Sequence, residues 1–166
     1  PVLAERVPHI MHNFRITATK NDYFASADNG AGYIMPGMLQ EPREISGLPS
    51  GLEVWAKHCK KYYNKWGLSI TGFVIDGHAP GLNEEGLDCY ASFSPNGIVP
   101  QKTVTASLHG NMPIIRADLD INDGDPKVAA GRIVERVKER SVIPFHWFRN
   151  ILKQPTWYCE VMDEVK

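Results

Sequence analysis

Apolar side chains recur along the chain at two spacings, which predict alternating helices and strands. The clearest stripe has apolar residues three or four positions apart and lysines mainly off the stripe. A capping box at Ser50–Glu53 is predicted before this helix, and Gly67 is a natural stop after it. The stripe consists of Leu52, Trp55, Cys59, Tyr62 and Trp66.

Three weaker helical patterns accompany this one. Apolar residues between positions 3 and 14 predict a helix with Pro8 near its start. Asp125 and Pro126 predict the capped start of a second helix, with apolar residues at 130, 133, 134 and 137 facing inward. A third helix is predicted near 156–165.

Four strands are predicted, near 23–28, 70–76, 112–119 and 143–148. The run at 73–75 has no polar alternation, which indicates burial on both faces, as in a parallel sheet. The stretch 77–110 is too long for an ordinary connection and is expected to form a lid, a binding loop or a disordered segment. Pro95-Asn96-Gly97 within it predicts a turn, such as the tip of a small hairpin.

These elements predict an α/β fold with a mainly parallel sheet and about four βα units. Four units cannot close an eight-stranded barrel, so the sheet is either open or part of a larger (β/α) barrel. At 166 residues, the chain is expected to form a single α/β domain, 1–166.

Charge and composition exclude several functions. The 18 basic and 19 acidic side chains are nearly balanced, and without a polybasic run nucleic acid is not an expected partner. No apolar stretch has membrane-spanning length, so no membrane partner is expected either. The three cysteines lack metal-ligand spacing and are interpreted as buried side chains, although one disulfide among them stays open.

The most informative segment follows the first predicted strand. Asn29 leads into a turn in which Gly30 and Gly32 give the backbone freedom to approach a ligand, with Tyr33 beside it. Working loops of α/β proteins lie where parallel strands end. The glycines do not form a dinucleotide-binding motif, because Met35 occupies the place of its third glycine.

The spacing Gly30-x-Gly32-Tyr33-x-x-Pro36 resembles the signature of the GxGYxYP proteins, a bacterial family regarded as candidate glycoside hydrolases. The segments 21–24 and 72–77 resemble its C-terminal domain. The resemblance implies the C-terminal part of a longer protein, a carbohydrate ligand, a partner in the N-terminal part of the same protein, and an extracellular or periplasmic location. Met35 stands where the family has its second tyrosine, so this chain lacks that hydroxyl.

Aspartates near the predicted strand ends are the candidate catalytic groups. Asp76 ends the most buried strand, where it is either an acid or base of the reaction or the cap of the following turn. His78 is a candidate to orient Asp76 or to bind substrate. Asp28 occupies the matching place after the first strand, although Asp-Asn-Gly is also a good turn sequence.

The third strand offers Asp120 as a further carboxylate. The alternate positions of Arg116 and Asp118 favour an ion pair between them. Glycoside hydrolysis commonly uses two carboxylates, about 5 Å apart for retention and roughly 6.5–9.5 Å apart for inversion. No cofactor is expected, although a divalent cation held by Asp28, Asp76, Asp118 and Asp120 is a second interpretation of the acidic strand ends.

Aromatic residues in candidate loops could support a sugar ring. Tyr33 and Tyr90 are the candidate platforms, since aromatic faces stack on sugars and the hydroxyl adds a polar contact. The leading hypothesis is a glycoside hydrolase domain that acts on or binds carbohydrate. The alternative is a non-catalytic carbohydrate-binding or assembly domain of a larger bacterial protein, whose aspartates are turn caps.

Overall fold

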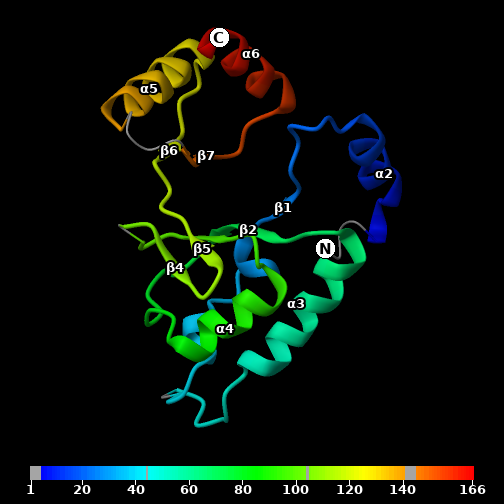
Figure 1. Cartoon of the computed structure of the whole chain (residues 1–166), viewed down its shortest axis with the longest axis vertical. Coiled ribbons are helices and arrows are strands. Elements are labelled where there is room, and N and C mark those ends of the chain that lie inside the picture. Colours follow the sequence, from blue (N-terminus) through cyan, green and yellow to red (C-terminus); the bar gives the residue numbers. More distant parts are fainter. Residues whose placement is uncertain (1–4, 44, 104, 141–144) are drawn as a thin grey trace. The chain divides into compact units, whose positions relative to one another are not determined.

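The computed structural model describes residues 5–43, 45–103, 105–140 and 145–166. The chain divides into two compact units, Pro1–Ile115 and Arg116–Lys166 (Figure 1). No helix in the described ranges is long and apolar enough to cross a membrane.

The first unit is built on a five-stranded sheet in the order β1-β2-β3-β5-β4. Four neighbours, β1, β2, β3 and β5, run parallel, and only β4 is antiparallel to its partner. The prediction of an α/β fold with a mainly parallel sheet is therefore confirmed. The strands are β1 (Ala25–Ser26), β2 (Ile70–Val74), β3 (Ile98–Pro100), β4 (Ser107–His109) and β5 (Met112–Ile114).

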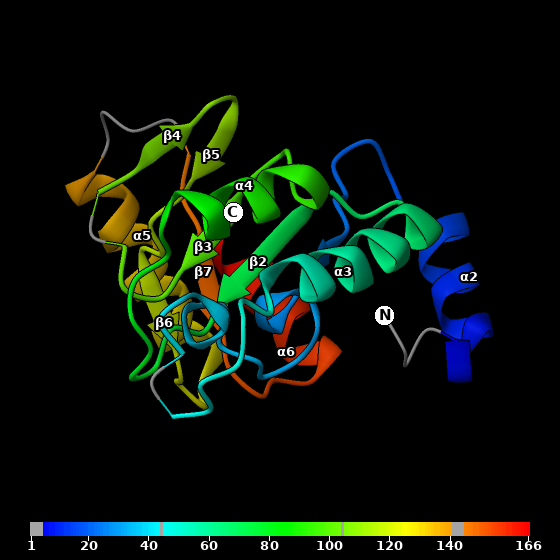
Figure 2. The same cartoon turned by 90° about the horizontal axis from the view of Figure 1, so that it is seen from below.

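The main core lies between this sheet and two helices, α3 (Leu52–Trp66) and α4 (Glu84–Phe93). Seen from below, α3 and α4 lie side by side in front of β2 (Figure 2). The ring of Trp55 packs edge-on against Tyr90 and Phe93, with centroids 4.9 Å and 5.3 Å apart. Such edge-to-face pairs stabilise a core beyond the area they bury.

The predicted stripe explains α3, but its predicted start is wrong. Leu52, Trp55 and Cys59 are buried, and Gly67 ends the helix in the left-handed conformation that glycine adopts without strain. Instead of a capping box, Gly51 is the N-cap residue, and the Ser50 hydroxyl accepts a hydrogen bond from the Leu52 amide at 3.3 Å.

The predicted N-terminal helix forms as α2 (Pro8–Thr17), yet none of its residues is buried. Ile10, Phe14 and Ile16 are 41%, 52% and 66% exposed. Arg15 anchors the helix, since its guanidinium donates to the Trp66 carbonyl and lies 3.9 Å from the centre of the Phe24 ring. The apolar side of α2 therefore has little cover within the described part of the first unit.

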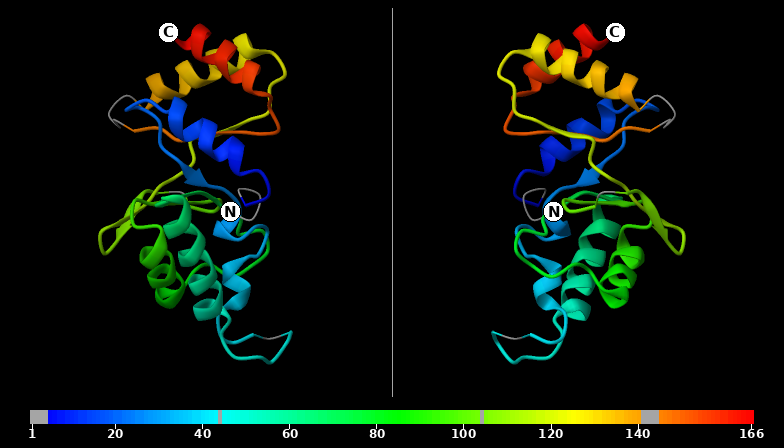
Figure 3. Two further views of the ribbon diagram at one scale, coloured as in Figure 1. Left: turned by 90° about the vertical axis from the view of Figure 1, so that its right-hand side faces the viewer. Right: turned by 90° about the vertical axis from the view of Figure 1, so that its left-hand side faces the viewer.

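The prediction of one long loop at 77–110 is wrong. The segment contains α4, β3 and β4, and Asn83 caps α4 by accepting from the Gly86 amide at 2.9 Å. The turn at 95–97 joins α4 to β3 rather than forming a hairpin tip. The hairpin is instead β4–β5, which projects from the unit (Figure 3). Short strands and a polar first helical turn hid these elements.

The second unit packs α5 (Pro126–Glu139) and α6 (Pro155–Val165) with a parallel pair, β6 (Leu119–Ile121) and β7 (Phe148–Asn150). The predicted Asp125 cap is confirmed, since its carboxylate accepts from the Lys127 amide at 2.9 Å. The predicted strand 112–119 is instead two strands, β5 and β6, because polar residues at 116 and 118 interrupt the apolar run. The fourth predicted strand forms only as β7, and positions 143 and 144 lie outside the described residues.

Candidate functional site

The candidate site lies beyond the carboxyl ends of β1 and β2. These two strands are parallel, so both ends lie at the same edge of the sheet. β1 is shorter than predicted, because Asp28 and Asn29 adopt positive φ and begin a 3-10 turn, Asp28–Gly30. Asn29 is completely buried and joins the two strand ends: its side-chain oxygen accepts from the Ile75 amide, and its side-chain nitrogen donates to the Ile34 carbonyl at 2.7 Å. Asn29 therefore holds the signature loop against the end of β2.

The signature glycines have different surroundings. A Cβ at Gly30, where φ is +85°, would lie 3.1 Å from both the Cys59 sulfur and the Tyr63 hydroxyl. Gly32 has φ of +81° but no neighbour within 4 Å of such a Cβ. Tyr33 is 78% exposed. Gly30 thus serves close packing and Gly32 serves only the turn, while the Tyr33 ring stays available for contacts from solvent.

Asp76 lies behind this loop and is only 7% exposed. Its carboxylate accepts from the Lys102 amide at 3.0 Å, while its backbone carbonyl accepts from the Ala79 amide at 2.8 Å. The side chain therefore ties β2 to the segment after β3, rather than capping its own turn. Asp28 is half-buried and precedes Asn29, while Asp76 follows Ile75. The hydrogen bond between Asn29 and Ile75 therefore brings the two aspartates to the same edge of the sheet.

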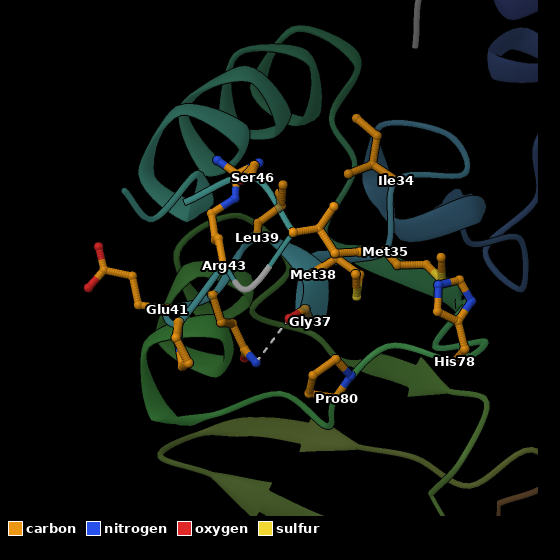
Figure 4. Close-up of a pocket in the computed structure, with 13 residues that line it drawn as sticks. Ile34, Met35, Gly37, Met38, Leu39, Glu41, Arg43, Ser46, His78 and Pro80 are labelled. Carbon is orange, nitrogen blue, oxygen red and sulfur yellow. Dashed lines mark hydrogen bonds between the residues drawn. The ribbon is translucent and has the colours of Figure 1, made fainter. Parts of the chain in front are cut away.

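A pocket of about 550 Å³ opens beside these turns (Figure 4). One wall is the loop that continues the signature, and the other is the turn after Asp76. Met35 and His78 lie close together at one end in Figure 4, while the Glu41 side chain points away. The lining residues are Ile34, Met35, Gly37, Met38, Leu39, Gln40, Glu41, Pro42, Arg43, Ile45, Ser46, His78 and Pro80.

The two walls are braced by Gln40, which is 7% exposed. Its side-chain nitrogen donates to the Gly81 carbonyl at 3.0 Å, and its oxygen accepts from the Asn83 amide at 2.6 Å. Gly37 lies directly against the Pro80 carbonyl, where a Cβ would overlap that oxygen. The pocket is therefore held by backbone contacts and by an amide side chain, and not by mobile surface groups.

Several predicted site residues lie elsewhere. Tyr90 is fully buried in α4, and burial raises the pKa of its hydroxyl well above the usual range. Its hydroxyl donates to the Asn29 carbonyl at 3.4 Å, so in this conformation the ring supports the turn and is closed to a sugar.

Arg116, Asp118 and Asp120 belong to the second unit. The predicted Arg116–Asp118 ion pair is wrong, because Asp118 binds the guanidinium of Arg140 and the amide of Trp147 instead. Asp120 forms a two-point ion pair with Arg149. Both aspartates are thus bound to partners of their own unit.

Metal ligands are not grouped in the described ranges: no three His, Cys, Asp or Glu side chains come together as a metal site requires. The cysteines are free thiols, and burial raises the pKa of Cys59 to about 12. A Cys59 thiol that stays protonated is an inert core side chain.

The residues that sequence reasoning missed are those of the loop after Pro36. Gln40, Arg43 and Met38 carry no motif, and only their place after a parallel strand marks them. Of the residues predicted to bind substrate, His78 lines the pocket, whereas Asn29, Gly30, Gly32 and Tyr33 are not among its lining residues.

The structure thus defines an α/β protein with a pocket at the carboxyl edge of a mainly parallel sheet. Residues 1–161 match the family described as GxGYxYP putative glycoside hydrolase C-terminal domain, and the chain belongs to that family. No curated protein and no solved structure matches the chain. The predicted family resemblance is confirmed.

Proposed function

We propose that this chain is the carbohydrate-binding C-terminal domain of a glycoside hydrolase and that the pocket beside Gly37 and His78 holds the sugar. The observation that carries this proposal is the placement of the family's signature loop. The loop follows β1 and lines the pocket together with the turn that follows β2. The carboxyl ends of parallel strands are where α/β proteins bind their ligands. The volume lies within the range of small-molecule sites, roughly 300–1,000 Å³.

Binding is better supported than cleavage by this domain alone. Among the described lining residues, Glu41 is the only carboxylate, whereas glycoside hydrolysis commonly needs two. Asp76 and Asp28 are the candidates for acid and base in the first unit, and Asp120 is the candidate in the second. We propose that the N-terminal part of the parent protein supplies the remaining catalytic groups.

The test compares the isolated domain and its full-length parent against neutral and acidic oligosaccharides, by calorimetry for binding and by product analysis for cleavage. Binding by the domain and cleavage by the parent are the expected results. Met38→Trp, which fills the pocket, should abolish binding, while Val54→Trp, on the exposed side of α3, should not. Glycan binding that survives Met38→Trp would rule out this pocket.

Asp76→Asn in the parent separates a catalytic role from a structural one. The asparagine oxygen still accepts from the Lys102 amide, so the fold should persist. Loss of cleavage with retained binding would assign Asp76 to acid–base chemistry. The structural role instead predicts full cleavage and a loss of about 1 kcal/mol in the free energy of unfolding.

An assembly domain is the second candidate, and the exposed side of α2 favours it. Ile10 and Phe14 lie one turn apart on a helix with no buried residue, which is typical of a surface that a partner covers. If assembly is the function, α2 amides should exchange hydrogen more slowly in the parent than in the isolated domain. Equal exchange rates would reject this alternative.

A further inference from the structure

Arg43 is a lining residue whose hydrogen-bonding capacity is largely unused. One terminal nitrogen, Nη1, donates to the Pro49 carbonyl at 3.1 Å, which anchors the guanidinium on its own loop. Its Nε is buried, so a bound molecule does not reach that atom. The other terminal nitrogen, Nη2, donates to no described residue and is the donor open to a bound acceptor.

The arginines of the second unit show a different arrangement. Arg132, Arg140 and Arg149 each lie against an aspartate of their own unit. Arg43 forms no ion pair with any described residue. Glu41 lines the same pocket, but its carboxylate accepts from the Ser50 amide at 3.0 Å and points away from the other lining side chains (Figure 4). The pocket therefore holds a positive charge that no described carboxylate neutralises.

We propose that the pocket selects an acidic sugar, a uronic acid, whose carboxylate is bound by Arg43. This inference rests on the proposed function, because it names the class of sugar for the same pocket. With Nη1 engaged by Pro49 and Nε buried, Nη2 is the guanidinium donor left for a carboxylate, and hydrogen bonds between charged partners are the stronger ones.

The other lining groups fit a uronic acid ring. Ile34, Met38 and Pro80 give an apolar surface for the C–H groups of the sugar. His78 supplies a donor or an acceptor for a hydroxyl from the opposite wall. Lys102 adds a positive charge near that wall, since its ammonium donates to the Ala79 carbonyl at 3.0 Å. Charge and shape therefore favour an anionic sugar over a neutral one.

The first experiment uses the unchanged domain and matched probes. The trimers of galacturonate, glucuronate and mannuronate are compared by calorimetry with their methyl esters, which keep the ring and lose the charge. We expect at least one acid to bind roughly 10- to 100-fold more tightly than its ester. Equal affinities of acid and ester, or binding of neutral oligosaccharides alone, would overturn the inference while leaving the proposed function intact. If no acidic or neutral sugar binds, both fail.

The second experiment uses substitutions. Arg43→Gln should remove the preference for the acid over the ester, and Arg43→Lys should keep part of it, because lysine retains the charge without the planar fork. Arg6→Gln removes an exposed arginine that does not line the pocket and should change nothing. Thermal unfolding confirms that each variant is folded. An unchanged preference in folded Arg43→Gln would also overturn the inference.

Discussion

Asn29 in the first unit and Asp118 in the second perform similar structural tasks with different chemistry. Each is a buried polar side chain that ties together two separated segments. Asn29 does so with a neutral amide that both donates and accepts. Asp118 accepts from the Trp147 amide and is surrounded by Arg136, Arg140 and a histidine, His146, 3.6 Å from its carboxylate.

The difference bears on function. Asn29 closes the signature loop with a neutral amide, which needs no charged partner. Further along the loop, Arg43 donates to a backbone carbonyl and forms no ion pair with a described carboxylate. In the second unit, Arg136 and Arg140 form ion pairs with the Asp118 carboxylate. The charge of Arg43 in the first unit therefore stays available to a ligand, whereas the charges of the arginines around Asp118 are already neutralised by that carboxylate.

The largest effect is expected from Asn29→Ala. Substitution removes the partners of the Ile75 amide and the Ile34 carbonyl, and buried groups without partners are costly. We expect the free energy of unfolding to fall by about 3–4 kcal/mol, measured by urea denaturation. Asn29→Asp is the matched control: it still accepts from Ile75 but cannot donate to Ile34, so it should also destabilise. A loss under 1 kcal/mol for Asn29→Ala would contradict the role given to this clamp.

Gly30→Ala should be the next most damaging change. The new Cβ would crowd Cys59 and Tyr63 at 3.1 Å in a conformation that alanine disfavours. We expect a loss of about 2–3 kcal/mol, against about 1 kcal/mol for Gly32→Ala, which has the same strain and open space around it. Equal losses in the two variants would show that packing at Gly30 contributes nothing.

Asp118→Asn tests the charged clamp. The Arg136 and Arg140 side chains are 21% and 20% exposed, so solvent screens part of the lost attraction. We expect a loss of about 1–2 kcal/mol that shrinks in high salt, because ionic strength screens partly exposed charges. The effect of Asn29→Ala should not change with salt. Asp120→Asn, at a more exposed pair, should cost less than Asp118→Asn. If the loss for Asp118→Asn were as independent of salt as that for Asn29→Ala, the distinction between a charged clamp and a neutral one would not hold.

The smallest effect at neutral pH concerns two groups of the first unit that titrate only under alkaline conditions. Burial raises the pKa of Cys59 from 9.0 to about 12 and that of Tyr63 from 10.0 to about 12. Because the unfolded chain loses these protons first, unfolding should become easier between pH 9 and pH 12. Cys59→Ala should flatten that decline, while Cys159→Ala, at an exposed thiol, should not. Denaturation midpoints across this pH range provide the measurement.

Some of the molecule could be predicted from local patterns and some could not. The α3 stripe and the Asp125 cap are local, and both were identified. Tyr90 was expected in a loop, but its burial depends on Trp55, which is distant in sequence. Arg43 carries no motif, and whether a described carboxylate pairs with it depends on tertiary contacts. Local sequence therefore indicates a strongly patterned helix such as α3 and a cap such as Asp125, although it did not predict the start of α3 or the presence of α4. Exposure and charge pairing depend on tertiary contacts.

Gly37 has a consequence for attempts to redesign the ligand preference of this domain. It meets the Pro80 carbonyl backbone to backbone, so the distance between the two walls at that point is set by the main chain. Exchanging side chains at Met38 or Ile34 can reshape the walls and floor, but it cannot narrow or widen this point. A library for altered selectivity should therefore vary those two positions and leave glycine at 37, since any larger residue there would push the walls apart.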